Sequence, residues 1–220
     1  MQHLPQNTGW IEVICGPMFS GKTEELIRRL KRALLGQQRV QIFKPRLDRR
    51  YADAAIVSHS DQRLEGTPLD HIEELPGLVL PDTQVVGIDE IQFFGASAVA
   101  VCERLADRGL RVVVAGLDQD YRGVPFEPMP QLLAVAEYIS KELAVCVVCG
   151  NPAGRSQRLT NDERRIVVGA HGAYEARCRA CFRPEGDSPT RTLGKTLGRT
   201  PGPAQPLLPL TPHGGLPRAR

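Results

Sequence analysis

The chain has 220 residues, of which 41% are hydrophobic and 24% are charged, an ordinary composition for a globular protein with a sizeable core. No apolar run approaches the ~20 residues that a membrane-spanning helix requires, so a membrane protein of that kind is excluded. The net charge of +3 arises in residues 184–220, which hold five basic and two acidic residues, leaving 23 of each sign in residues 1–183. Residues 1–183 thus have no excess of basic residues, which argues against a nucleic-acid-binding protein.

We interpret residues 1–9 as an N-terminal extension, because the first apolar run begins at Trp10. The extension lacks the charged-then-apolar order of a secretory signal peptide. We therefore expect a cytoplasmic protein.

From Trp10 onwards, short apolar runs alternate with segments in which apolar residues recur at helical spacing. This alternation predicts an α/β domain with a mostly parallel sheet that is covered by helices on both faces. The expected strands are residues 10–15, 40–43, 85–88, 112–114 and 139–145. One helix is expected to begin near Gly21, and two others are expected at residues 98–108 and 131–137.

Between the first expected strand and helix, residues 16–23 (GPMFSGKT) fit the pattern G-x-x-x-x-G-K-[ST] of the P-loop. In this context the backbone N–H groups are expected to cradle the phosphates of ATP. Lys22 would reach the β- and γ-phosphates, and Thr23 would offer its hydroxyl to Mg²⁺. The alternative is an ordinary glycine-rich turn. The residues expected to bind the nucleotide here are Gly16, Pro17, Met18, Phe19, Ser20, Gly21, Lys22 and Thr23.

The pattern between residues 44 and 84 is polar and irregular, with charged residues close together at 46–53. A solvated loop and a functional loop or partner contact are both compatible with this pattern.

Two acidic residues follow the strand expected at residues 85–88. Asp89, at the carboxyl end of that strand, is typical of a Walker B carboxylate that holds Mg²⁺. Glu90 would then face the same cleft and accept a proton from an attacking hydroxyl. The alternative for Glu90 is a loop carboxylate that faces solvent.

Two C-x-x-C pairs, Cys146 with Cys149 and Cys178 with Cys181, are separated by 28 residues. This spacing predicts a tetrahedral four-cysteine zinc site with no open coordination position, hence a structural metal. Disulfides are the alternative, and a reducing cytoplasm disfavours them. Cys15 and Cys102 are expected in the core.

These patterns divide the chain into the extension at 1–9, a P-loop nucleotide-binding domain at 10–145 and a zinc domain at 146–183. Residues 184–220 contain eight prolines and six glycines with few aliphatic residues, so we expect a disordered tail.

Four separated motifs occur in an order that resembles the type II thymidine kinase family: GPMFSGKT, IDEIQFF at 88–94, GLDQDYRGVPF at 116–126 and the paired C-x-x-C motifs. The resemblance covers about residues 11–181. It implies a RecA-like P-loop domain and a small zinc-ribbon-like domain whose loop closes over the nucleoside. It also implies ATP-dependent phosphorylation of thymidine, a homotetramer, and feedback inhibition by thymidine triphosphate.

Carried over residue by residue, the resemblance makes Glu90 the general base and Asp89 the Walker B carboxylate, followed by Gln92 in the nucleotide site. Asp48 and Arg50 match residues associated with the sugar and the transferred phosphate. The remaining residues matched to the thymidine pocket are Met18, Phe93, Leu117, Tyr121, Ser156, Val167, Val168, Gly169 and Tyr174.

Within that pocket, the main chain of residues 167–169 would hydrogen-bond the base, and Tyr174 would lie near the deoxyribose. For Phe93, Leu117 and Tyr121 the alternative is plain core packing. The sequence departs from the family at Gly169-Ala170, where a Gly-Gly pair is usual, and Ser156 occupies a position that is often Thr.

Three other functions remain open at this point. One is a P-loop kinase of another nucleoside, one is a DNA-binding ATPase with a zinc ribbon, and one is a nucleotide sensor without catalysis. The electrically neutral body disfavours the ATPase. The joint presence of Lys22, Thr23, Asp89 and Glu90 disfavours the sensor.

Overall fold

The computed structural model describes residues 8–46, 55–57, 63–160 and 172–184. These segments belong to one compact unit, Met1–Asp187. Over these segments no helix combines the length and the apolar character that crossing a bilayer requires.

The described segments contain a sheet of six parallel strands, in the order β5-β2-β6-β7-β1-β8. Strands β1, β6 and β7 are rich in Val and Ile and are buried along almost their whole length, as expected for a parallel sheet covered on both faces. The predicted α/β class is confirmed. The strands are β1 (Trp10–Gly16), β2 (Val40–Pro45), β5 (Thr67–Leu69), β6 (Val85–Ile88), β7 (Arg111–Leu117) and β8 (Tyr138–Lys141).

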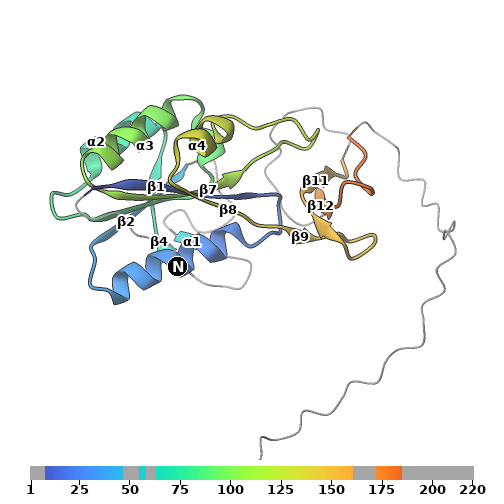
Figure 1. Cartoon of the computed structure of the whole chain (residues 1–220), viewed down its shortest axis with the longest axis horizontal. Coiled ribbons are helices and arrows are strands. Elements are labelled where there is room, and N and C mark those ends of the chain that lie inside the picture. Colours follow the sequence, from blue (N-terminus) through green and yellow to red (C-terminus); the bar gives the residue numbers. More distant parts are fainter. Residues whose placement is uncertain (1–7, 47–54, 58–62, 161–171, 185–220) are drawn as a thin grey trace, which may run out of the picture. The chain divides into compact units, whose positions relative to one another are not determined.

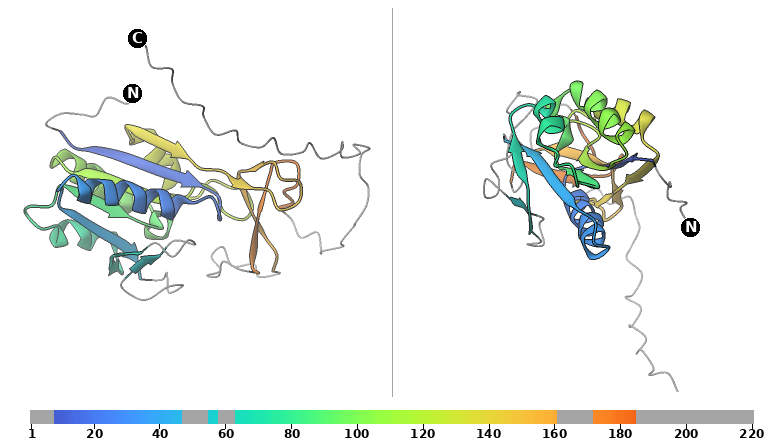
Figure 2. Two further views of the ribbon diagram at one scale, coloured as in Figure 1. Left: turned by 90° about the horizontal axis from the view of Figure 1, so that it is seen from below. Right: turned by 90° about the vertical axis from the view of Figure 1, so that its left-hand side faces the viewer.

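Helices cover the two faces of this sheet unequally (Figure 1). Among the described residues, the helix on one face is α1, which crosses the near side of the strands in the left view of Figure 2, and Leu64 packs against the same face. The other face packs against the remaining helices and two short 3₁₀ helices. The helices are α1 (Lys22–Leu35), α2 (Leu75–Leu78), α3 (Ser97–Asp107) and α4 (Met129–Val135), and the 3₁₀ helices are η1 (Ile72–Glu74) and η2 (Ile91–Phe94).

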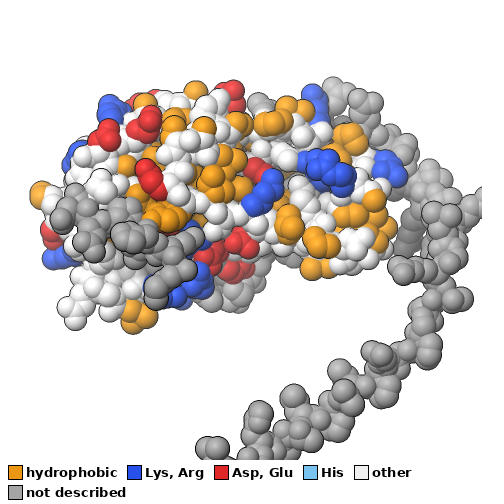
Figure 3. All heavy atoms as spheres, viewed as in Figure 1, with side chains coloured by type: hydrophobic (Ala, Val, Ile, Leu, Met, Phe, Trp, Pro, Cys, Tyr) orange, Lys and Arg blue, Asp and Glu red, His pale blue; other side chains and the backbone are white. Residues whose placement is uncertain are grey.

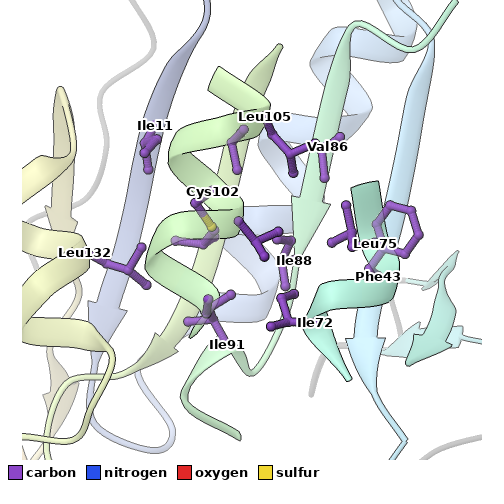
Figure 4. Close-up of a cluster of buried hydrophobic side chains, with 14 of the residues drawn as sticks. Ile11, Phe43, Ile72, Leu75, Val86, Ile88, Ile91, Cys102, Leu105 and Leu132 are labelled. Carbon is purple, nitrogen blue, oxygen red and sulfur yellow. The ribbon is translucent and has the colours of Figure 1, made fainter. Parts of the chain in front are cut away.

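Two apolar cores result, one on each face of the sheet. Figure 4 shows part of the larger one, which includes Ile88 of β6 and both Cys102 and Leu105 of α3. On the opposite face, α1 buries Leu26, Ile27, Leu30 and Ala33, which recur at helical spacing. Leu30 packs so closely on β6 that a Cβ at Gly87 would lie 2.5 Å from its Cδ1.

The structure differs from the sequence interpretation between residues 44 and 84. The described part of this segment adds β5 to the edge of the main sheet and continues into η1 and α2. It also contains β3 (Ala55–Val57) and β4 (Arg63–Glu65), which pair with each other. Leu69, Ile72 and Leu75 are fully buried here, but polar neighbours hide their periodicity in the sequence.

The single strand expected at residues 139–145 is two strands. β8 pairs with β1 and ends at Lys141, and the Glu142 N–H then donates to the Cys15 carbonyl at 2.8 Å. β9 (Ala144–Val145) pairs instead with β10 (Pro152–Ala153), outside the main sheet. A change of partner within one apolar run leaves no signal in local periodicity.

Beyond β9 the chain forms short antiparallel pairs around the cysteines. β11 (Arg155–Arg158) pairs with β12 (Tyr174–Arg177), and both lie past the carboxyl ends of the parallel strands (Figure 1). Their small core consists of Ala144, Cys146, Ala153, Ala176 and Cys178.

Candidate functional site

The P-loop follows β1 and bends sharply at both of its glycines. Gly16 has φ +147°, and a Cβ there would lie 2.2 Å from the Glu142 carbonyl oxygen, so only glycine fits. Gly21 adopts a left-handed conformation immediately before α1. The Lys22 ammonium donates to the Pro17 carbonyl at 2.6 Å, and the Ser20 hydroxyl donates to the same oxygen at 2.9 Å. The loop therefore closes on itself at the amino end of a helix, the arrangement that binds phosphate.

Phe19 and Met18 join the P-loop to the cysteine-rich part of the chain. Phe19 has φ +66°, and its side chain packs against the small core around Cys146 and Cys178. The Met18 N–H donates to the Ser156 hydroxyl of β11 at 2.9 Å. These contacts were not foreseen from the sequence, because they connect residues that lie far apart in it.

Asp89 and Thr23 meet at the carboxyl edge of the sheet. Asp89 is 7% exposed, and its Oδ2 accepts a hydrogen bond from the Thr23 hydroxyl at 3.2 Å. Its Oδ1 accepts from the Glu90 N–H at 3.0 Å. The site thus brings together the hydroxyl and the carboxylate that the sequence predicted as Mg²⁺ ligands, and this oxygen donor set suits that ion.

Glu90 adopts a left-handed backbone conformation, with φ 50° and ψ 41°. Non-glycine residues in this region are uncommon, and they gather at functional sites where the surrounding structure holds them. The hold is visible here, because the buried Gln92 donates from Nε2 to Glu90 Oε2 at 2.5 Å. Gln92 Oε1 in turn accepts from the Leu117 N–H at 3.0 Å. Gln92 therefore joins the end of β7 to Glu90.

The apolar residues matched to the thymine ring are not core residues. Met18, Phe93, Leu117 and Tyr121 are all partly exposed, and they come from the P-loop, η2, the end of β7 and the turn after it. Phe93 meets Phe126 edge to face, with ring centroids 6.4 Å apart. This exposure is the property that a ligand-binding wall needs and that plain core packing lacks.

Sequence reasoning did not identify two buried, charged residues of this region. Arg158 in β11 is 8% exposed and contacts both Tyr121 and Tyr174. Asp118 is buried and forms an ion pair of 2.6 Å with the Lys141 ammonium. Arg158 lies outside the four motifs and Asp118 lies within GLDQDYRGVPF, but each meets its partner only through the fold.

The four cysteines form a compact cluster, with Sγ atoms within 4.8 Å of one another. The Cys149 Sγ lies 3.5 Å from that of Cys178 and 3.6 Å from that of Cys181, too far for a disulfide and close to the edge of a zinc–thiolate tetrahedron. Burial opposes ionisation of Cys146, but backbone hydrogen bonds at Cys178, Val148 and Cys149 outweigh it and lower its pKa to about 6. Burial and the neighbouring thiols raise the pKa of Cys181 to about 12. This donor set fits zinc.

Five residues predicted to form the site, Asp48, Arg50, Val167, Val168 and Gly169, lie outside the described residues. The described ones converge at the carboxyl edge of the sheet and on β11 and β12, which is where parallel α/β folds bind ligands.

Fold and site together define a P-loop nucleotide-binding α/β protein with a four-cysteine cluster. The family model for thymidine kinase matches residues 9–182. A thymidine kinase of Rhodothermus sp. (strain ITI 518) is 56% identical over 199 residues, which cover 90% of each chain. A thymidine kinase of Bdellovibrio bacteriovorus is 56% identical over 182 residues, covering 83% of this chain and 89% of the relative.

The chain belongs to the thymidine kinase family, as its motifs predicted. It is therefore a kinase, a nucleotide-binding transferase that uses ATP.

Proposed function

We propose that this chain transfers the γ-phosphate of ATP to the 5′-hydroxyl of thymidine and so supplies thymidine monophosphate for DNA synthesis by nucleotide salvage. The observation that carries the proposal is the linked set Thr23, Asp89, Glu90 and Gln92. It joins the P-loop to a carboxylate beside the partly exposed Phe93. Family membership supports thymidine as the nucleoside.

In this proposal Glu90 is the catalytic residue. Its carboxylate accepts the proton of the 5′-hydroxyl as that oxygen attacks the γ-phosphorus in line. The constrained backbone of Glu90 and its hydrogen bond from Gln92 hold the carboxylate in one position. A fixed base contributes through positioning as well as through proton transfer.

The phosphates are bound by the P-loop backbone and by Lys22, whose ammonium leaves the Pro17 carbonyl for them. Thr23 and Asp89 would hold Mg²⁺, which when bound neutralises charge on the phosphate oxygens. Arg50 would stabilise the transferred phosphoryl group, with Asp48 near the sugar. Both of these assignments derive from the resemblance.

The nucleoside is bound by Met18, Phe93, Leu117 and Tyr121 around a single ring, with Ser156 and Tyr174 on β11 and β12. The main chain of residues 167–169 would hydrogen-bond the base. We also propose that the cysteines hold a structural Zn²⁺ at the base of this closing loop, and that residues 10–145 and 146–183 act as the nucleotide and zinc domains.

Other parts of the proposal derive from the resemblance and the composition alone. They are a cytoplasmic homotetramer, inhibition by thymidine triphosphate and a tail at 184–220 that is not needed for catalysis. The protein is not expected to act on nucleic acid, and on the visible face in Figure 3 acidic and basic side chains are interspersed with apolar ones.

The test is a phosphoryl-transfer assay with thymidine, deoxycytidine, deoxyadenosine and deoxyguanosine, run beside an ATPase assay with and without DNA. Phosphorylation of thymidine in preference to the other three supports the proposal. Preference for another nucleoside would assign a different substrate on this scaffold. ATP hydrolysis that needs DNA and no nucleoside would replace the kinase reaction with a motor function.

A further inference from the structure

We propose that Arg158 is a positioning residue for the nucleoside, which acts by holding Tyr121 and Tyr174 in one arrangement. The inference rests on the proposed function, in which these two tyrosines form part of the thymidine pocket. It concerns a residue outside the sequence motifs.

The position of Arg158 places it between the two rings. It is the last residue of β11 and stands opposite Tyr174 of β12 in the antiparallel register. Only 8% of the residue is exposed, and Tyr174 is equally buried at 8%. A buried guanidinium loses much of its hydration, so its contacts with protein groups have to replace that loss.

The contacts of Arg158 use both properties of a planar guanidinium. Its central carbon lies 3.5 Å from the centroid of the Tyr121 ring and 5.3 Å from that of Tyr174. One terminal nitrogen also donates a hydrogen bond of 2.7 Å to the Tyr174 hydroxyl. Stacking needs the flat face of the group and the hydrogen bond needs its edge, so lysine cannot supply both.

The turn that carries Tyr121 is fixed independently of its ring. Asp120 Oδ1 accepts hydrogen bonds from the Arg122 and Val124 N–H groups at 2.9 and 3.1 Å. These bonds hold the backbone, whereas Arg158 contacts the ring. Arg122, which is exposed, also donates a hydrogen bond of 2.9 Å to the Tyr121 hydroxyl. Loss of Arg158 would therefore leave the turn in place and remove the buried guanidinium from the face of the Tyr121 ring.

β11 links three parts of the proposed pocket. The Ser156 hydroxyl accepts a hydrogen bond from the Met18 N–H of the P-loop. Arg158 contacts Tyr121, which follows β7, and Tyr174, which lies on β12. A change at Arg158 is therefore expected to affect thymidine more than ATP. A purely structural role would instead affect both substrates, the metal content and the melting temperature together.

The experiment compares Arg158→Met, which keeps most of the side-chain length, with Arg158→Lys and with the control Arg104→Met. Arg104 is an exposed arginine of α3, outside the proposed pocket. We expect Arg158→Met to raise the KM for thymidine on the order of tenfold. The KM for ATP, the zinc content and the Tm should stay close to those of the wild type. Lysine should restore little, and the control should change nothing.

A double-mutant cycle with Tyr121→Leu tests the route of the effect. If Arg158 acts through Tyr121, Arg158→Met should raise the KM for thymidine much less in the Tyr121→Leu enzyme than it does in the wild type. If Arg158→Met does not fold, Arg158→Lys is judged by the same measurements.

Three results would overturn the inference: an unchanged KM for thymidine, equal losses for thymidine and ATP, or full rescue by lysine. Each of them presupposes a wild-type enzyme that phosphorylates thymidine. Failure of the wild type to do so would instead refute the proposed function.

Discussion

The side-chain amide of Gln92 donates a hydrogen bond of 2.5 Å to the carboxylate of Glu90. The oxygen of the same amide accepts a hydrogen bond from the Leu117 N–H. Gln92 thereby links the proposed general base to the end of β7. The backbone of Glu90 is in addition held in a left-handed conformation. The carboxylate is thereby set in place before any substrate binds, which lowers the reorganisation that catalysis requires.

Replacement of Glu90 by Gln should lower kcat by about 10²–10⁴-fold, because it removes the proton acceptor but keeps the shape of the side chain. ATP affinity, measured by titration calorimetry, should be nearly unchanged. Glu103→Gln, an exposed substitution on α3, is the matched control and should leave kcat unaltered. A Glu90→Gln enzyme with wild-type turnover would remove Glu90 from the mechanism.

Replacement of Gln92 by Leu should lower kcat by roughly tenfold, less than the loss at Glu90, because the base is retained but no longer held. The Leu117 N–H also loses its acceptor, which should cost about 1–3 kcal/mol of the free energy of unfolding. Steady-state kinetics and denaturant unfolding measure the two effects.

Gln131→Leu, on the exposed side of α4, controls for the substitution itself. In the Glu90→Gln background, Gln92→Leu should cause almost no further loss of kcat, because there is no base left to position. Full multiplication of the two losses would show that Gln92 acts elsewhere.

The four-cysteine cluster should hold about one zinc per chain, as a four-thiolate site requires. Cys149→Ser should lose the metal and lower the Tm, since metal affinity contributes directly to folding. Elemental analysis and thermal unfolding measure this, with Cys102→Ala, a thiol of α3 outside the cluster, as the control that keeps the metal. Freshly purified reduced protein without bound metal would contradict the assignment.

Thymidine should be preferred over deoxycytidine by roughly 10²-fold or more in kcat/KM. Main-chain groups at residues 167–169 have fixed polarity, whereas cytosine reverses the acceptor at O4 and the donor at N3 of thymine. Deoxyguanosine should fail because the proposed wall of Met18, Phe93, Leu117 and Tyr121 admits one ring. Deoxyuridine, which keeps both polar groups, is the control, and comparable values for thymidine and deoxycytidine would refute base reading by the main chain.

The sequence alone determined the elements whose information is local. The P-loop at residues 16–23, the acidic pair after β6 and the C-x-x-C pairs each place their chemistry within a few residues. Alternating apolar runs likewise predicted the parallel sheet, because burial on both faces demands continuous Val and Ile. These signals also supported the family assignment, which the comparisons confirm.

Only the tertiary structure decided how distant segments meet. β5 joins the edge of the sheet although the residues around it in the sequence are polar. The run at 139–145 divides between two sheets because its first part pairs with β1 and its last part with β10. Gln92 reaches Leu117 and Arg158 reaches Tyr121 across long stretches of chain. Such contacts depend on where strands end in space, a property that neither residue type nor local spacing encodes.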